Sequence, residues 1–480
     1  MCLFRLGLPC AFLYLEFRWA SVVPLRLSIP VDVTMNKTSV FFALLIISSG
    51  LLMNSNQTIA QTTPSAALVN RIDQVRPDAP ELAKFGAYNI GVRTLQLTDS
   101  GRPDILNVRA GEETPLYDRQ LTVEAWYPAQ LSEGQAAAGS YQTLTRNTEL
   151  TATLNGRAVR DADALTTDGA FPLVVVSHGY PGNRMLMSHL GENLASKGYV
   201  VVSIDHADST YDDQKAITST LYNRAPDQRF VISAMAAISA DSTHALSGII
   251  DADNTGLIGY SMGGYGAVNN LGAGYSETGV SFLGSPPNRL LQDFAASNPD
   301  FTDTLDPRIK AGVPIAPWGM NNGFWDADGL AGLTVPSLFV AGDVDTTSGY
   351  ENGIKAIFDQ AVNSDRYMLV FKNSGHNAGA PMPLPVEFYG REDQTGSGHY
   401  TDAVWDNLLM NNILQHFVTA FLDLHLKGQS AQREYLDILE DGAEAVYSLN
   451  HEGIPNPQHT YWKGFAPGRT VGLKMLKGQP

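Results

Sequence analysis

The feature that most constrains the fold lies in the middle of the chain, at Leu257–Gly266 (LIGYSMGGYG). A short apolar strand runs into a Gly-x-Ser-x-Gly turn, and small residues that open a helix follow it. A serine at such a turn sits in a cramped backbone, where Gly259 and Gly263 leave room for the neighbouring helix and strand. The turn presents the hydroxyl of Ser261 to solvent, and the N–H of Met262 points to where a negatively charged oxygen would form. We therefore predict Ser261 as a nucleophile and Met262 as an oxyanion donor.

From Phe171 onward, buried strands alternate with helices. We expect strands at Leu173–Ser177, Tyr199–Ile204, the apolar run at Leu257, Ile309–Ala316, Pro336–Ala341 and Tyr367–Phe371, and helices at Met185–Lys197, Arg229–Leu246, Tyr350–Phe358 and Thr401–Lys427. Alternating units of this kind predict a mostly parallel central sheet with helices on both faces. Two segments upstream of these units are also expected to be strands. Apolar and polar residues alternate in Tyr88–Leu97, which predicts an antiparallel strand, and Leu121–Tyr127 is predicted to be another. The ligand site is expected beyond the ends of the parallel strands.

A serine nucleophile needs a base, and the base needs an orienting acid. Two loops that follow later strands offer these groups in the order serine, acid, histidine. We predict His376 as the base, because it follows its strand directly and sits among small, turn-forming residues. Asp345 is the preferred acid because it lies further past its strand end than Asp343, which stays an alternative. His399 is a rival base, but it precedes a helix instead of following a strand.

The second oxyanion donor is expected in the loop after the first core strand. Gly179 allows the backbone to turn inward there, and the N–H of Tyr180 is the predicted donor. His178 lies beside it and is expected to brace the loop and to stand near the substrate. Trp318 ends another strand and is predicted either to wall the pocket or to pack in the core. His206 follows the strand before the serine turn and is interpreted as structural.

The first residues are set apart from the fold. A second start at Met35 carries one positive charge and is followed by an apolar run and small residues, so 35–60 is predicted to be a secretory signal peptide. Residues 1–34 are then an upstream extension. A membrane anchor is the alternative, but the apolar runs are too short for a typical span. Both cysteines, Cys2 and Cys10, lie upstream of Met35, so the mature chain is expected to contain no disulfide, thiol nucleophile or cysteine-ligated metal.

The remaining chain is expected to form one catalytic domain. Residues 61–83 are interpreted as a flexible lead-in, 84–430 as the catalytic domain, and 431–480 as a C-terminal extension packed on it. Within the domain, 274–306 is rich in Gly, Ser, Pro and Asp and is predicted to be a lid or rim insertion. The formal net charge of −17 over 480 residues argues against nucleic acid and anionic membranes as partners.

Several segments together resemble a known group of proteins. They are 171–179 (FPLVVVSHG), 194–199 (LASKGY), 205–209 (DHADS), 259–264 (GYSMGG) and the early strand at 121–128. This set resembles the type II platelet-activating-factor acetylhydrolases and the bacterial exported dienelactone-hydrolase-like serine esterases. The resemblance covers roughly residues 84–425, and its motifs are specific to the α/β-hydrolase superfamily, not to one substrate.

The resemblance implies an α/β-hydrolase fold and a site made of Ser261 as nucleophile, His376 as base, Asp345 as acid, and Tyr180 and Met262 as oxyanion donors. Tyr180, Met262 and Trp318 also look like subsite residues of bacterial cutinase-like polyester hydrolases. Two departures limit the resemblance. True dienelactone hydrolases use a cysteine nucleophile, and the polyester hydrolases lack both the insertion at 274–306 and a tail after 430.

The sequence therefore predicts a secreted or periplasmic serine hydrolase that cleaves carboxylic esters of small molecules through an acyl-enzyme on Ser261. Such chemistry requires no cofactor and no metal. A polyester, cutinase-like or phospholipid-acetyl ester substrate is an alternative, followed by a peptidase or amidase. A catalytically inactive binding module is the alternative outside the enzymes. The natural ester and the oligomeric state stay open.

Overall fold

Six parallel strands form the centre of a mixed sheet in this computed structural model, which describes residues 68–480. They are β8 (Phe171–Ser177), β9 (Val200–Asp205), β10 (Ile250–Tyr260), β11 (Ile309–Ile315), β12 (Ser337–Gly342) and β13 (Arg366–Phe371). Their order across the sheet is β13-β12-β11-β10-β8-β9. The chain therefore reverses its winding direction at β8 and β10, and a ligand site is expected beyond the carboxyl ends of these two strands.

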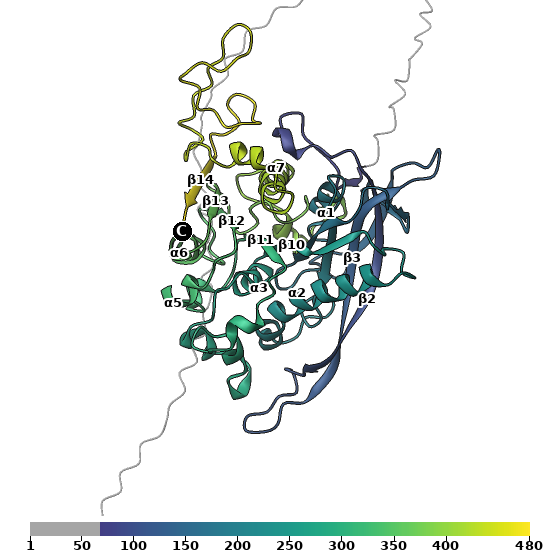
Figure 1. Cartoon of the computed structure of the whole chain (residues 1–480), viewed down its shortest axis with the longest axis vertical. Coiled ribbons are helices and arrows are strands. Elements are labelled where there is room, and N and C mark those ends of the chain that lie inside the picture. Colours follow the sequence, from purple (N-terminus) through teal and green to yellow (C-terminus); the bar gives the residue numbers. More distant parts are fainter. Residues whose placement is uncertain (1–67) are drawn as a thin grey trace, which may run out of the picture. The chain divides into compact units, whose positions relative to one another are not determined.

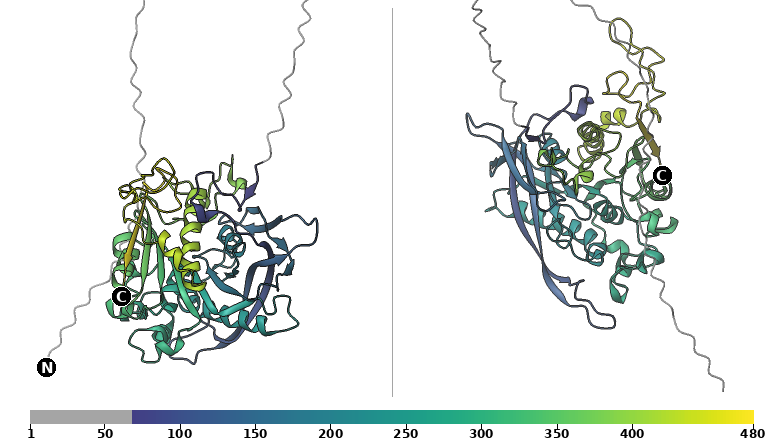
Figure 2. Two further views of the ribbon diagram at one scale, coloured as in Figure 1. Left: turned by 45° about the horizontal axis from the view of Figure 1, so that its top comes forward. Right: turned by 180° about the vertical axis from the view of Figure 1, so that it is seen from behind.

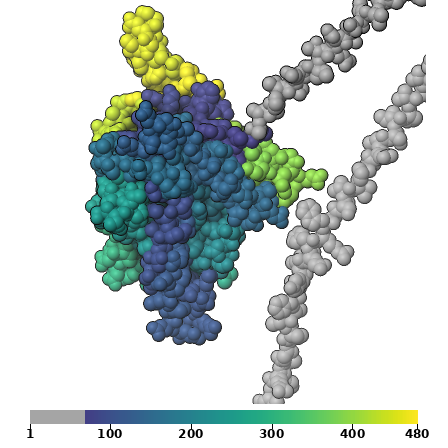
Figure 3. All heavy atoms as spheres, turned by 90° about the vertical axis from the view of Figure 1, so that its right-hand side faces the viewer, coloured from purple at the N-terminus to yellow at the C-terminus, as the bar shows by residue number. Residues whose placement is uncertain are grey.

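Antiparallel strands extend the sheet at both edges. The long strands β2 (Asn89–Pro103) and β3 (Leu116–Gln130) pair with each other, and β3 pairs with β9. Figure 2 shows them as a curved ribbon at the edge of the sheet, and its blue end projects in Figure 3. Short pieces β6 (Val159–Arg160) and β7 (Asp163–Ala164) pair with this ribbon. At the opposite edge, β14 (Leu473–Gly478) pairs with β13.

Helices cover both faces of the sheet. Helices α1 (Ser188–Ala195) and α7 (Asn407–Leu426) lie on one side of β10 and β11, and α2 (Ile217–Ala240) and α3 (Met262–Asn270) lie on the other (Figure 1). The shorter helices are α4 (Glu277–Val280), α5 (Ala327–Ala331) and α6 (Lys355–Gln360). This arrangement confirms the predicted fold class. No helix of residues 68–480 is long and apolar enough to cross a membrane.

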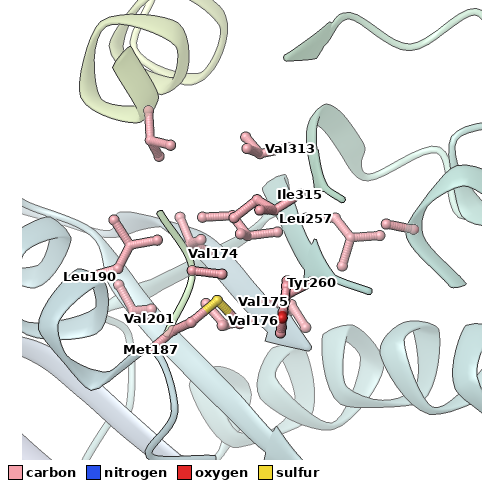
Figure 4. Close-up of a cluster of buried hydrophobic side chains, with 14 of the residues drawn as sticks. Val174, Val175, Val176, Met187, Leu190, Val201, Leu257, Tyr260, Val313 and Ile315 are labelled. Atoms are coloured by element: carbon pink, nitrogen blue, oxygen red, sulfur yellow. The ribbon is translucent and has the colours of Figure 1, made fainter. Parts of the chain in front are cut away.

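The core explains why the central strands read as continuous apolar runs. Side chains of β8 and β9 such as Val174 and Val201 are buried, because helices cover the sheet on both sides. Figure 4 shows both residues in a cluster of buried side chains that also includes Leu190 of α1, Leu257 of β10 and Ile315 of β11. Burying each such side chain contributes about 1.5–3 kcal/mol, so this cluster fixes the strands whose ends carry the site.

Two helices differ most from their predicted starts. Helix α2 begins at Ile217, twelve residues before the predicted start, and it continues through Pro226. Proline removes one backbone hydrogen bond from a helix interior, but the first half of α2 is largely buried and Arg224 and Asp227 anchor it through hydrogen bonds described below. Helix α7 begins at Asn407 instead of 401, where the carboxylate of Asp406 caps it by accepting from the N–H of Leu409 at 2.8 Å.

Both flanking segments contribute to the folded unit more than expected. In the predicted flexible lead-in, β1 (Asn70–Arg71) pairs with β5 (Thr151–Gly156), which pairs with β4 (Gly139–Leu144) in a small second sheet. The C-terminal extension adds β14 to the main sheet. The predicted upstream extension, the signal peptide and residues 61–67 lie outside the described residues.

The predicted insertion 274–306 holds α4 and two short 3₁₀ segments, Pro287–Phe294 and Phe301–Thr304. Tyr275 stacks on Tyr265 of α3 with ring centroids 5.2 Å apart. At its far side, the side-chain amide of Asn288 donates to the carbonyls of Arg109 and Glu112 at the tip of the β2–β3 ribbon, both at 3.1 Å. The insertion therefore packs on the domain at two places, and a lid role stays a prediction.

Candidate active site

The serine turn has the backbone that the glycine pattern predicts. Ser261 lies between β10 and α3 with φ 54° and ψ −113°, a conformation that side chains with a Cβ rarely adopt. A Cβ on Gly259 would lie 2.2 Å from the carbonyl oxygen of Gly263, and a Cβ on Gly263 would lie 2.0 Å from that of Ser177. Both positions therefore require glycine, and the turn holds the hydroxyl at the carboxyl edge of the sheet.

Three of the predicted site residues meet in one chain of hydrogen bonds. The Nε2 of His376 lies 2.9 Å from the Oγ of Ser261, and its Nδ1 lies 2.8 Å from Oδ2 of Asp345. The other carboxylate oxygen of Asp345 accepts from the backbone N–H groups of Thr347 at 2.7 Å and Ser348 at 3.0 Å. These contacts leave Asp345 one orientation, with a single oxygen toward the histidine.

The electrostatics of Asp345 keep it ionised. Burial acts to raise its pKa, but the hydrogen bond and charge of His376 and the two backbone donors outweigh burial, so its pKa lies below the ordinary value. An ionised carboxylate beside Nδ1 holds a proton on that nitrogen and leaves Nε2 as the acceptor for the serine hydroxyl proton.

The alternative acid, Asp343, is occupied elsewhere. Its Oδ1 accepts from the backbone N–H of Asn373 at 2.5 Å, which joins the loop after β12 to the loop after β13. No hydrogen bond among the described residues joins Asp343 to His376. The structure thus brings Asp345, and not Asp343, to the histidine.

The loop after β8, which carries the predicted oxyanion donor Tyr180, lies close to Ser261. A Cβ on Gly179 would lie 3.2 Å from the Cβ of Ser261, so glycine lets the backbone come near and brings the N–H of Tyr180 to the same edge. Met262 is the first residue of α3, where a helix leaves its N–H groups without an intrahelical acceptor. Among residues 68–480, no backbone carbonyl accepts a hydrogen bond from the N–H of Tyr180. Both predicted donors are therefore free to bind an oxygen.

His178 lies under this loop and is only 1 % exposed, so the prediction that it contacts substrate is wrong. Its Nδ1 donates to the carbonyl of Gly179 at 2.7 Å, while its Nε2 accepts from the N–H of His206 at 3.2 Å. Burial, then the charge of Arg224, lowers its pKa well below the ordinary value, so the ring is neutral. The guanidinium of Arg224 donates to the carbonyl of His178 at 2.7 Å. His178 and Arg224 together hold the shape of the loop.

A second serine–histidine–aspartate set lies in the interior. His206 Nε2 is 2.8 Å from Oγ of Ser177, and its Nδ1 is 2.9 Å from Oδ2 of Asp227. Arg119 donates to the same carboxylate at 2.8 Å. All three members are at most 1 % exposed, and burial lowers the pKa of His206 to about 3. We call this set, Ser177, His206 and Asp227, the inner trio; it ties β8 and β9 to α2, in keeping with a structural His206.

A pocket of about 450 Å³ opens in front of Ser261. It is lined by Arg146, Gly179, Tyr180, Tyr260, Ser261, Thr347, His376, Asn377, Gly396, Gly398 and His399. His399 belongs to the wall, and no hydrogen bond joins it to the serine in the described residues. Burial, then the charge of Arg146, lowers its pKa to about 3, so its ring is neutral and does not take the place of His376.

Sequence reasoning missed several residues of this wall, among them Tyr260, Asn377 and Arg146. Tyr260 donates to Oδ1 of Asn377 at 3.0 Å, and Asn377 donates to the carbonyls of Gly398 and Thr401. These bonds fix the loop that carries His376. The only sequence signal for Tyr260 and Asn377 was their position next to predicted catalytic residues, since Tyr260 precedes Ser261 and Asn377 follows His376.

Trp318 lies beside the serine turn, but it is not among the residues that line the pocket. Its N–H donates to the carbonyl of Ser261 at 3.2 Å. Its half-buried ring packs edge-on against Phe282 of the insertion and Tyr265 of α3, each 6.1 Å away between centroids. Of the two predicted roles, the structure shows packing.

The sheet has the α/β-hydrolase fold. A serine lies at the strand-to-helix turn after β10, and the acid and histidine loops follow β12 and β13. Residues 129–275 match the family model described as PET hydrolase-like. That match includes Tyr180 and Ser261 and ends before Asp345 and His376.

Comparison with known proteins gives three further findings. Cutinase est1 of Thermobifida alba is 25% identical over 212 residues, which cover 44% of this chain and 55% of that protein. The bis(hydroxyethyl) terephthalate hydrolase of Streptomyces coelicolor is 25% identical over 214 residues, 44% of this chain and 52% of that protein. The chain thus spans about half the length of the curated relatives it matches. A ferulic acid esterase structure from Streptomyces cinnamoneus aligns with a TM-score of 0.51 and 22% identity over 75% of this chain and 94% of that one, which shows a shared fold.

Proposed function

We propose that the chain is a serine hydrolase of carboxylic esters. The observation that carries the proposal is the hydrogen-bonded series from Ser261 through His376 to Asp345, at 2.9 and 2.8 Å, with Ser261 and His376 on the wall of an open pocket. A serine, a base and an orienting carboxylate at these distances form the arrangement that activates a hydroxyl for attack on a carbonyl.

The proposed reaction uses these residues in turn. The Oγ of Ser261 attacks the ester carbonyl carbon while Nε2 of His376 takes the hydroxyl proton. The carbonyl oxygen becomes negative and accepts hydrogen bonds from the N–H groups of Tyr180 and Met262. The C–O bond to the alcohol breaks, His376 gives that alcohol its proton, and an acyl-enzyme remains. Water, losing a proton to His376, attacks the acyl carbon, and the acid leaves as the proton returns to Ser261.

The comparisons support ester substrates. The relatives are named a cutinase and a bis(hydroxyethyl) terephthalate hydrolase, and both names describe ester cleavage. Polyester-type esters are therefore the second candidate substrate class. Hydrolysis of bis(hydroxyethyl) terephthalate beside short p-nitrophenyl esters compares the two classes directly, and an anilide panel tests for amidase activity.

The proposal is tested with p-nitrophenyl butyrate and a fluorophosphonate probe on the purified chain. We expect Ser261→Ala to abolish turnover and labelling. The matched control is Ser177→Ala, because Ser177 also lies 2.8 Å from a histidine nitrogen but is buried. This control is expected to keep labelling and most of the turnover. Wild-type turnover by Ser261→Ala would overturn the proposal, and a wild type that neither labels nor hydrolyses would favour the inactive binding module.

We further propose export, on the basis of the signal-like segment 35–60. Expression of the full chain in a bacterial host, followed by N-terminal sequencing of the protein in the periplasm and medium, tests it. A mature protein that begins near Gln61 is expected, and cytoplasmic retention of the uncut chain would contradict export.

A further inference from the structure

Arg146 lines the pocket and, unlike the arginines near it, has no carboxylate partner among residues 68–480. Arg146 lies in the turn between β4 and β5 of the small sheet, outside the main sheet. Its backbone N–H donates to the hydroxyl of Tyr400 at 2.9 Å, which fixes the turn beside the loop 396–399. Its side chain lines the pocket together with Ser261 and His376.

The guanidinium of Arg146 has no carboxylate partner among residues 68–480. Nearby arginines do: Arg157 pairs with Asp73 at 3.0 Å, Arg160 with Glu124 at 2.5 Å and Arg184 with Glu124 at 3.1 Å. Arg146 instead makes one long contact of 3.5 Å to the carbonyl of Pro181. Most of its five N–H donors are therefore available to a ligand.

The pocket wall contains no group that would neutralise this charge. None of its lining residues is an aspartate or glutamate. His399 is neutral, since burial and the charge of Arg146 lower its pKa to about 3. In a chain with a formal net charge of −17, the cavity beside the serine thus presents a positive charge, which would attract an anionic substrate.

We propose that this hydrolase acts on esters that also carry a carboxylate, and that Arg146 binds that carboxylate. The inference rests on the proposed function and names its substrate class. A planar guanidinium matches a carboxylate with two parallel hydrogen bonds. A phosphate monoester carries more charge than one guanidinium offsets, so a carboxylate fits the single arginine better. The carboxylate belongs either to the acyl part or to the alcohol part of the ester.

Two pairs of esters distinguish a carboxylate on the alcohol part from one on the acyl part. In the first pair, 4-acetoxybenzoate and its methyl ester, the charge lies on the leaving alcohol. In the second, ethyl hydrogen adipate and diethyl adipate, it lies on the acyl part. For each pair the ratio of kcat/KM of the anionic ester to that of the neutral ester is measured, so that intrinsic reactivity cancels when enzyme variants are compared.

We expect Arg146→Gln to lower this ratio about tenfold for at least one pair, with Arg146→Lys in between because lysine keeps the charge but loses the fork. Sodium chloride at 0.5 M should lower the wild-type ratio toward that of Arg146→Gln. The matched control is Arg109→Gln, an exposed arginine at the tip of the β2–β3 ribbon that does not line the pocket. Thermal melting confirms that each variant is folded.

The outcomes are distinct. Ratios that stay equal in wild type and Arg146→Gln for both pairs, with all four esters hydrolysed, would overturn the role of Arg146 and leave the esterase intact. No hydrolysis of any of the four esters or of p-nitrophenyl butyrate by the wild type would overturn the proposed function itself, and this inference with it.

Discussion

Replacing Asp345 by asparagine tests the proposed mechanism at one atom. The carboxylate accepts from the N–H groups of Thr347 and Ser348 through Oδ1 and faces Nδ1 of His376 through Oδ2. An asparagine has one acceptor oxygen and one NH₂ group. If its oxygen keeps the two backbone donors, its NH₂ group must face His376, which then accepts at Nδ1 and carries its proton on Nε2. A protonated Nε2 does not take the proton of Ser261.

The opposite amide orientation is disfavoured by the same contacts. Turning the NH₂ group toward Thr347 and Ser348 would leave two N–H donors unsatisfied, at about 1–3 kcal/mol each. The histidine therefore takes the wrong tautomer in most molecules. Such a change in serine hydrolases lowers kcat by roughly 10⁴-fold, or about 5 kcal/mol of transition-state stabilisation. The fold should persist, because the oxygen still accepts both backbone hydrogen bonds.

The assay is kcat for p-nitrophenyl butyrate at pH 7.5 with thermal melting of the same samples. Asp343→Asn is the matched control, since Asp343 lies in the same loop and bonds Asn373 instead of the histidine. Its kcat is expected to fall less than tenfold. An Asp345→Asn variant with more than a tenth of wild-type kcat, or an Asp343→Asn variant equally impaired, would refute the assignment of Asp345.

Three further outcomes are expected. Arg224→Met should lower kcat by about tenfold or more with a smaller change in KM, because the loop that carries the proposed oxyanion donor Tyr180 loses its brace. An unchanged kcat in a folded variant would contradict this. Gly263→Ala should give little folded protein in a soluble-yield and circular-dichroism comparison, since its Cβ would lie 2.0 Å from the carbonyl of Ser177. His206 and His399 are buried and have pKa values of about 3. The free energy of unfolding, measured with urea, should therefore fall as the pH drops from about 6.5 toward 3, because these histidines bind protons in the unfolded chain but not in the folded one. Constant stability over that range would refute the last expectation.

The sequence was most informative where local chemistry determines the backbone. Glycines at 259 and 263 predict a turn that tolerates no side chain, and the structure has that turn around Ser261. The order of strands and the loops after them also placed His376 and Asp345 within reach of the serine. Continuous apolar runs predicted most of the central strands within a few residues, because burial on both faces favours apolar side chains. The exception is β10, which begins at Ile250 instead of Leu257.

Long-range contacts account for what the sequence did not predict. Arg146 belongs to a small sheet that joins residues 70–71 to residues 139–156, and no local pattern announces that pairing. Helix α2 runs through Pro226 because tertiary hydrogen bonds of Arg224 and Asp227 hold it. His178 was expected near substrate from its position in the chain, but side-chain direction is set by the neighbours that surround it.

The inner trio shows that interatomic distances alone do not define a serine hydrolase site. Among residues 68–480, a search for serine, histidine and aspartate at hydrogen-bonding distance would return two sets, one around Ser261 and one around Ser177. The second has no solvent path to its hydroxyl. Active-site titration with a covalent inhibitor should therefore reach an endpoint of one equivalent per chain, and automated geometric annotation of related proteins needs an accessibility filter to avoid counting both.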